Sequence, residues 1–214
     1  MAADEIRLSQ AEAHAYWRRP DDGDNDPRAY LDFEGDERKP AMRCQRSEAL
    51  VSLVRQYLPL DATILEIGCN AGRNLKYLLN SGYRRLNAIE ISAAAIDTMR
   101  EMEPEVFAAT RIDVGPIEEA VRELEPADAI VTMATLVHLP FESEWVFAEI
   151  ARKVRHRMFI VEFEGEHPHP RMFPRRYRPI FEAAGLEQVA AIHPFPGMIN
   201  AYVGRIFKPC SQTI

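Results

Sequence analysis

The sequence predicts an α/β fold: a doubly wound, mostly parallel seven-stranded sheet with helices on both faces, an antiparallel C-terminal strand pair and an N-terminal cap. Three observations predict this class. From residue 63 onward, short apolar runs alternate with segments whose apolar residues recur at helical spacing. A turn bounded by glycines joins the first apolar run to the first helical segment. The last two apolar runs are separated only by a short segment rich in proline and glycine.

The alternation can be assigned element by element. Apolar residues at helical spacing predict a first helix over 47–57, which Pro59 ends. The expected strands are 63–67, 86–91, 107–112, 129–133, 158–163, 186–192 and 201–207. The expected helices between them are 73–80, 94–102, 117–124, 142–154 and 177–184. Because the last two strands are so close in sequence, we expect them to pair antiparallel.

The N-terminal part of the chain differs from the rest. Residues 20–27 form an acidic, turn-forming stretch, and the segments on both sides of it carry aromatic residues. We therefore interpret residues 1–45 as a cap or lid segment and residues 46–214 as the main domain.

Composition limits the partners and the compartment. The chain has 33 acidic and 26 basic residues and a formal charge of -7, which argues against a nucleic-acid partner. Its three cysteines are scattered without any pair spacing, which favours a reducing compartment. No apolar run resembles a secretory signal or is long enough to span a membrane. We expect a cytoplasmic protein without a membrane partner, and the sequence does not indicate its oligomeric state.

The turn after the first predicted strand has the sequence Gly68-Cys69-Asn70-Ala71-Gly72. Gly68 permits a sharp turn, and Gly72 lets the backbone approach a ligand at the start of a helix, where free amides favour an anion. A dinucleotide fingerprint requires glycines where Asn70 and Arg73 stand, which weakens the interpretation as a nicotinamide site. No Gly-Lys-Ser/Thr of a P-loop is present. The turn therefore predicts a ligand site of another type.

Glu90 stands at the end of the second predicted strand, about 20 residues after this turn. An acidic side chain at that position can accept hydrogen bonds from both hydroxyls of a ribose. NAD and S-adenosylmethionine (SAM) share this ribose, so Glu90 indicates a nucleoside and does not distinguish the two.

Segment 66–72, Glu90 and segment 112–114 resemble motifs I, II and III of the class I SAM-dependent methyltransferases of small molecules. The resemblance extends over residues 47–207, and the sheet of that family also ends in an antiparallel pair. It implies that SAM is the cofactor, with its methionine part near Glu66, its ribose held by Glu90 and its adenine contacted by Asp113. Asn70 departs from the commoner glycine of the family's loop. The cofactor-binding residues implied in this way are Glu66, Gly68, Cys69, Asn70, Gly72, Glu90, Ile91, Asp113, Val114 and Met133.

Segment 132–140 resembles motif IV of the same family and is expected to line the cleft from which the methyl group leaves. It contains His138, whose imidazole has an ordinary pKa near neutrality and can take a proton from an attacking oxygen or nitrogen. The alternative is that His138 packs against the loop and fixes it. We predict His138 as a catalytic base and keep the packing role as the competing hypothesis.

Candidate substrate residues come from the cap and from the late loops. Tyr16 and Tyr30 are aromatic residues of the cap that either fold over the cofactor or pack on the core. His167 stands in an H-x-H segment near acidic residues, but the flanking prolines indicate a stiff loop more than a metal site, and we predict no metal. Arg175 belongs to a local group of arginines that suits a substrate carboxylate or phosphate.

Together these residues predict methyl transfer to an O or N atom of a small metabolite by direct in-line displacement, with His138 or a cap tyrosine as a possible base. Three alternatives stay open: a protein or peptide methyltransferase, a SAM-binding protein without methyl transfer, and, least favoured, a nicotinamide oxidoreductase. The sequence does not identify the methyl acceptor, because acceptor pockets are built from loops without recognisable motifs.

Overall fold

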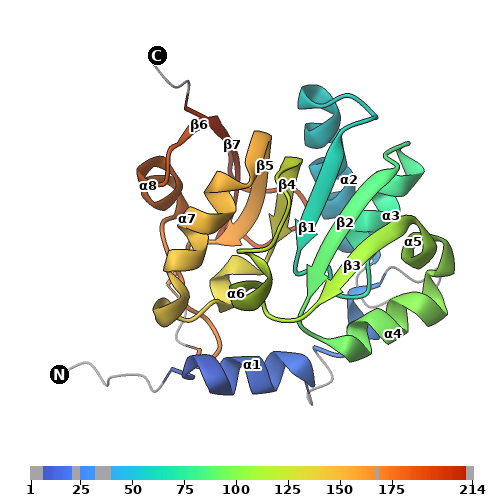
Figure 1. The fold of residues 1–214 in the computed structure, drawn as a ribbon, viewed down its shortest axis with the longest axis horizontal. Helices are drawn as coiled ribbons and strands as arrows, with labels where there is room; N and C mark the ends of the chain where they lie inside the picture. Colours follow the sequence, from blue (N-terminus) through green and yellow to red (C-terminus); the bar gives the residue numbers. More distant parts are fainter. Residues whose placement is uncertain (1–6, 21–24, 32–39, 167–168, 211–214) are drawn as a thin grey trace.

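The computed structural model describes residues 7–20, 25–31, 40–166 and 169–210, and they form one seven-stranded sheet in the order β3-β2-β1-β4-β5-β7-β6 (Figure 1). The strands are β1 (Thr63–Ile67), β2 (Arg85–Glu90), β3 (Thr110–Val114), β4 (Ala127–Met133), β5 (Val154–Phe163), β6 (Leu186–Ile192) and β7 (Tyr202–Pro209). Strands β1 to β5 pair in parallel, whereas β7 pairs antiparallel with both β5 and β6. The predicted doubly wound sheet with an antiparallel C-terminal pair is confirmed.

Helices cover both faces of the sheet (Figure 1). The helices are α1 (Gln10–Arg18), α2 (Pro40–Tyr57), α3 (Arg73–Asn80), α4 (Ala93–Met102), α5 (Pro104–Ala109), α6 (Ile117–Ala120), α7 (Trp145–Arg152) and α8 (Tyr177–Ala183). Three short 3₁₀ helices are η1 (Pro27–Tyr30), η2 (Leu136–His138) and η3 (Phe141–Ser143). Helices α2 to α5 pack on one face and α6 to α8 on the other, and each side buries its own hydrophobic cluster.

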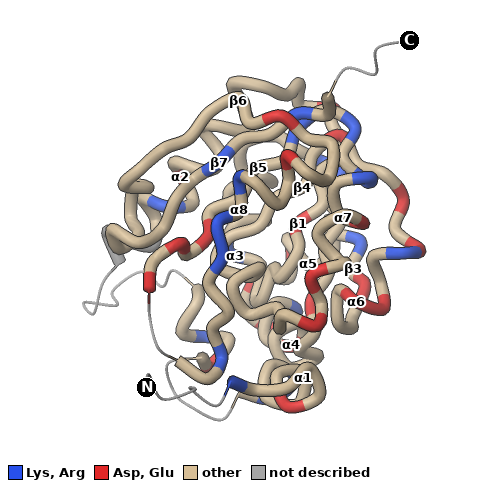
Figure 2. Tube along the Cα trace, turned by 90° about the vertical axis from the view of Figure 1, so that its left-hand side faces the viewer, with Lys and Arg blue, Asp and Glu red and all other residues tan. Residues whose placement is uncertain are grey.

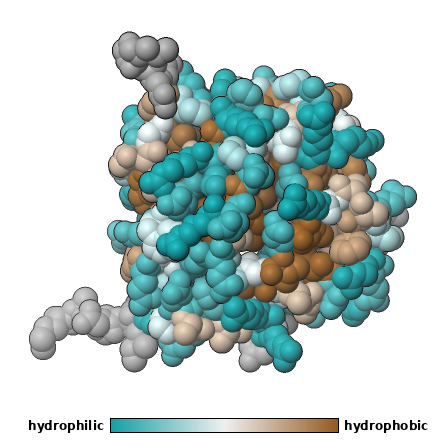
Figure 3. Space-filling view, viewed as in Figure 1, coloured by the Kyte–Doolittle hydropathy of each residue, from teal (hydrophilic) through white to brown (hydrophobic). Residues whose placement is uncertain are grey.

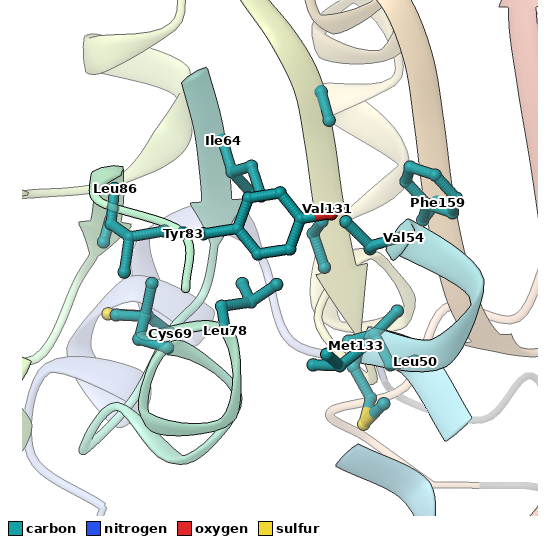
Figure 4. Close-up of a cluster of buried hydrophobic side chains, with 14 of the residues drawn as sticks. Leu50, Val54, Ile64, Cys69, Leu78, Tyr83, Leu86, Val131, Met133 and Phe159 are labelled. Atoms are coloured by element: carbon teal, nitrogen blue, oxygen red, sulfur yellow. The ribbon is translucent and has the colours of Figure 1, made fainter. Parts of the chain in front are cut away.

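Figure 4 shows the cluster under α2 and α3, where Tyr83 lies among Leu78, Val54 and Val131. The ring of Tyr83 is fully buried, and its hydroxyl donates to the backbone oxygen of Leu58 at 3.1 Å. Burying side chains of this size stabilises the fold by roughly 1.5–3 kcal/mol each. This packing fixes the sheet, so the turns at the carboxyl ends of the strands start from a rigid base.

Strand β5 begins at Val154, four residues before its predicted start, and two other elements differ more from the sequence-based prediction. Residues 107–112 were expected to be extended, but the chain is helical as far as Ala109 and β3 begins only at Thr110. Pro104 opens α5 at its first turn, and alanines favour the helix that follows. The predicted helix 117–124 is reduced to α6, because Lys153 Nζ donates to the carbonyl oxygens of Arg122 (3.1 Å) and Leu124 (2.6 Å), which satisfies them outside a helix.

The N-terminal elements lie along the lower edge of the sheet in Figure 1, where the arrowheads of the parallel strands point. Helix α1 starts at a capping box, in which Ser9 and Glu12 exchange hydrogen bonds with each other's backbone. Helix α2 begins at Pro40, not near residue 47, so the predicted boundary between cap and main domain falls within a continuous helix.

The surface bears residues of both charges, and Figure 2 shows Lys/Arg and Asp/Glu intermixed along the trace. On the face shown in Figure 3, hydrophilic residues predominate, with a hydrophobic group in front of β2 and β3. Among the described residues, no helix combines the length and the apolar character needed to cross a membrane.

Candidate functional site

A cavity lies between the carboxyl ends of β1, β2 and β4 and helix α1, with an empty volume of about 1100 Å³ that includes solvent at its mouth. In a doubly wound sheet this edge is where ligands bind. The walls come from the turn after β1, the end of β2, the segments after β3 and β4, and the N-terminal elements. The residues that line the cavity include Ala13, His14, Trp17, Tyr30, Arg46, Glu66, Gly68, Cys69, Asn70, Arg73, Asn74, Glu90, Ile91, Gly115, Pro116, Ile117, Glu118, Met133, Ala134, Thr135, His138 and Leu139.

The turn after β1 forms the floor of the cavity. Its Gly68 has a φ of +73°, and a Cβ there would lie 2.3 Å from Thr135 Cγ2, so only glycine fits. Asn70 also has a positive φ of +49°, a conformation that asparagine tolerates, and its Oδ1 accepts from the amide of Ala71 at 2.7 Å. The asparagine therefore replaces a glycine without breaking the turn. Burial raises the pKa of the Cys69 thiol well above its usual value, which keeps this cavity residue neutral.

Gly72 is the last residue of the turn before α3, and it does not line the cavity. It precedes α3 with a φ of +87°, and a Cβ there would lie 2.9 Å from Met99 Cε. The space that this glycine leaves is therefore occupied by Met99 of α4. The expected contact between Gly72 and a ligand stays a prediction.

Glu90 is buried at the end of β2 and faces the turn. Its Oε2 accepts from the amide of Asn70 at 2.7 Å, and its Oε1 accepts from the amide of Ser92 at 2.9 Å. Burial raises the pKa of Glu90 despite these two bonds. Each carboxylate oxygen retains acceptor capacity, which suits a pair of ribose hydroxyls.

Glu66 carries an unpaired oxygen at the cavity wall. Its Oε1 accepts from Asn74 Nδ2 at 2.8 Å, whereas its buried Oε2 has no hydrogen-bond partner among the described residues. Asn74 Oδ1 in turn accepts from Ser47 Oγ at 2.7 Å, which fixes the amide orientation. Burial raises the pKa of Glu66 to about 8. A buried acid with a free oxygen is a ready partner for a ligand ammonium group.

The structure places Asp113 and Val114 outside this cavity. Both lie in a second hollow beside α6, and Val114 is 54% exposed. The residues that line the cavity after β3 are the next four along the chain, 115–118. The predicted adenine contact by Asp113 is therefore not supported by its position, because the chain turns into the cavity only after β3 has ended.

His138 ends the turn after β4 and lines the cavity. Its Nδ1 lies 2.8 Å from the carbonyl oxygen of Arg171, which can only accept, so Nδ1 carries the hydrogen and Nε2 keeps a lone pair. The ring packs against Trp17 of α1 with a centroid separation of 4.3 Å. Burial lowers the pKa of His138 to about 4, so the imidazole is neutral at pH 7.

The four candidate substrate residues differ in their position relative to the cavity. Tyr30 lines the cavity, whereas Tyr16 lies outside its lining and accepts a hydrogen bond from Asn25 Nδ2 at 2.7 Å. Arg175 is buried outside the cavity lining, where it pairs with Glu144 (3.2 Å) and donates to the carbonyl oxygens of Leu139 (2.7 Å) and Phe173 (2.8 Å). The prediction for His167 falls outside the described residues.

Several cavity residues have no counterpart in the sequence-based prediction. On the cap side, Glu118 Oε1 accepts from His14 Nε2 at 3.0 Å, which joins α1 to the segment after β3. On the opposite side, Arg73 Nη1 donates to the backbone oxygen of Tyr30 at 3.1 Å, and Arg73 Nε donates to Ser47 Oγ at 3.0 Å. No local motif signals these contacts, because they join segments far apart in the sequence.

The glycine turn, the acid at the end of β2 and the doubly wound sheet define a Rossmann-like protein with a site for a nucleoside-containing cofactor. Residues 64–157 match the family described as methyltransferase domain. Residues 64–157 therefore form a SAM-dependent methyltransferase domain, which confirms the resemblance noted in the sequence.

Solved structures agree with this fold. Magnesium protoporphyrin IX methyltransferase from Synechocystis PCC 6803, with bound S-adenosylhomocysteine (SAH), is 15% identical with a TM-score of 0.71, covering 94% of this chain and 98% of its own. A TehB-like SAM-dependent methyltransferase from Corynebacterium glutamicum is 20% identical with a TM-score of 0.60, covering 75% and 87%. The 1,6-didemethyltoxoflavin-N1-methyltransferase from Burkholderia thailandensis is 18% identical with a TM-score of 0.61, covering 77% and 78%. No curated protein sequence matches the chain.

Proposed function

We propose that the protein transfers the methyl group of SAM to an O or N atom of a small metabolite by direct in-line displacement. The observation that carries the proposal is the cavity itself, in which the free oxygen of Glu66, the turn at Gly68 and the carboxylate of Glu90 face one space. When bound, SAM supplies a methyl group already activated on a sulfonium, so no covalent enzyme intermediate is needed.

The residues present fit this cofactor. Glu66 Oε2 suits the ammonium of the methionine part, and Glu90 suits the ribose hydroxyls. Gly68 keeps the floor of the cavity free of a side chain. Residues 115–117 line the wall that follows β3 and are proposed to contact the adenine in place of Asp113.

His138 is the residue that we propose to act on the acceptor. Its Nε2 lone pair can accept a hydrogen bond or a proton from an attacking hydroxyl or amine, because Nδ1 is held by Arg171. With a pKa of about 4, His138 is a weak base that orients such a group more than it ionises it. Alignment and exclusion of water then supply most of the catalysis.

Helix α1 favours a small acceptor over a peptide. Ala13, His14 and Trp17 all line the cavity from the cap side, so an acceptor beneath them is covered. Covered pockets of this kind suit molecules that can be enclosed almost entirely.

Two measurements, made one after the other, test the proposal. Isothermal titration with SAH should show binding, and Glu90→Ala should weaken it. Incubation of the enzyme with methyl-labelled SAM and a cell extract, followed by separation by size, should place the label in the small-molecule fraction. Label in the protein fraction would support a peptide methyltransferase, and SAH binding without labelled product would support a binding protein.

A further inference from the structure

The carboxylate of Glu162, near the end of β5, lies outside the cavity but contacts the turn that forms one of its walls. Glu162 is fully buried, and its Oε1 accepts from Thr132 Oγ1 at 2.8 Å and from the amide of Thr135 at 3.1 Å. Its Oε2 accepts from the amide of Val137 at 3.2 Å. Burial raises the pKa of Glu162 to about 7. A carboxylate is costly to bury, and all three donors belong to β4 and the turn after it.

The turn depends on this support from outside. Ala134 has a φ of +54°, which is unfavourable for a residue with a Cβ. Thr135, the residue that caps η2, provides no side-chain cap for it. The amides of Thr135 and Val137 are bonded to Glu162 instead, so the carboxylate replaces the missing cap.

The same turn carries the chemistry of the site. Ala134, Thr135 and His138 line the cavity, and Thr135 packs directly against Gly68. The ring of His138 is fixed at its other end by the carbonyl oxygen of Arg171. A shift of the turn would therefore move the imidazole directly, and the Gly68 turn only through its contact with Thr135.

We propose that Glu162 is a positioning residue for methyl transfer, whose buried carboxylate holds the turn 134–138 in the geometry that places His138 at the acceptor end of the cavity. This inference rests on the proposed function, because the reaction gives the positioning its purpose. The contacts themselves do not depend on which molecule accepts the methyl group.

The variant that isolates this role is Glu162→Gln, which keeps the shape but has only one acceptor oxygen and turns an NH₂ group toward a backbone amide. The matched control is Glu164→Gln. Glu164 is also buried, but it pairs with Arg205 (2.7 Å) and the amide of Tyr177 (3.3 Å), away from the turn. Both changes replace a buried carboxyl group by an amide, and only one of them loosens the turn.

The readout is the state of His138, followed by ¹⁵N NMR of the imidazole, and the emission of Trp17 in a Trp145→Phe background. Glu162→Gln should move the His138 titration midpoint toward its ordinary range and change the Trp17 emission, whereas Glu164→Gln should change neither. Once an acceptor has been identified, the rate of methyl transfer by Glu162→Gln should be about 10- to 100-fold lower than that of the wild type. Its SAH affinity should fall much less.

Unchanged His138 signals and an unchanged transfer rate in a folded Glu162→Gln protein would overturn the proposal. If that variant does not fold, Thr132→Val removes one of the three donors at nearly constant volume. It should move the His138 titration midpoint in the same direction by a smaller amount. An unchanged midpoint in Thr132→Val would also overturn the proposal. Failure of the wild-type protein to bind SAH would instead refute the proposed function, and the NMR comparison separates the two outcomes.

Discussion

Gly68 and Thr135 lie so close together that a Cβ at position 68 would come within 2.3 Å of Thr135 Cγ2. One residue belongs to the turn after β1 and the other to the turn after β4, so the two walls of the cavity are packed against each other at this point. The glycine is thus required by a neighbouring side chain as well as by its own positive φ.

Gly68→Ala should therefore abolish SAH binding, because the added methyl group either collides with Thr135 or displaces the turn. Gly185→Ala is the control: its φ is +91°, but a Cβ there meets no atom within 4 Å. It should cost about 1–2 kcal/mol of stability and leave binding intact. The double variant Gly68→Ala/Thr135→Gly should recover part of the affinity. Binding by Gly68→Ala close to that of the wild type would contradict the contact.

Proton release on binding SAH is expected from Glu66. With a pKa of about 8, Glu66 is mostly protonated at pH 7, and pairing with the ligand ammonium requires the carboxylate. Binding should thus release close to one proton at pH 7, and the affinity should rise with pH by up to about tenfold per unit until pH 8. Isothermal titration in buffers of different ionisation enthalpy measures this directly. Glu66→Gln should bind more weakly and release no proton; equal release by this variant would assign the proton elsewhere.

Glu90→Gln should weaken SAH binding by about 10- to 100-fold, because a buried acceptor is lost and its NH₂ group then faces the amide of Asn70 or of Ser92. A comparison of adenosine with 2′-deoxyadenosine, as competitors of SAH, tests the ribose contact. The wild type should prefer adenosine, and Glu90→Gln should lose that preference. Glu119→Gln, which changes an exposed acid on α6, is the control and should match the wild type. A preference that survives Glu90→Gln would place the ribose elsewhere.

Most of the fold could be predicted, because the apolar pattern that marks each strand or helix lies within that element. Strands 63–67 and 186–192 and helix 73–80 have the same bounds in the structure as in the prediction, since a glycine or a polar residue ends each apolar run. The segment 107–112 failed because Phe107 and the alanines after it suit a helix as well as a strand, and only the start of α5 at Pro104 decides between them.

The site could be predicted only where it is local. Glu66, Gly68 and Glu90 stand at the ends of β1 and β2, and the topology brings these ends together. His14 and Glu118 both line the cavity and contact each other, which joins the cap to the segment after β3. No spacing along the sequence encodes such contacts, so these contacts on the cap side of the cavity could not be predicted from motifs.

The low pKa of His138 leads to a final prediction about stability. Above pH 6.5 the imidazole is neutral in both the folded and the unfolded chain, so it contributes no pH dependence. As the pH falls from 6.5 toward the folded value of about 4, the unfolded chain takes up a proton that the folded protein does not, and stability is lost. Between pH 7 and pH 5 this loss amounts to about 2 kcal/mol.

Urea unfolding of the wild type and of His138→Gln at the two pH values measures the loss. The variant should lack this part of the pH dependence, whereas His156→Gln, which replaces an exposed histidine at the start of β5, should retain it. Equal slopes for the wild type and His138→Gln would mean that the imidazole is protonated as easily in the fold as in the unfolded chain. In that case His138 would be an ordinary base near neutral pH, and the transfer rate should then follow its titration between pH 6 and 7.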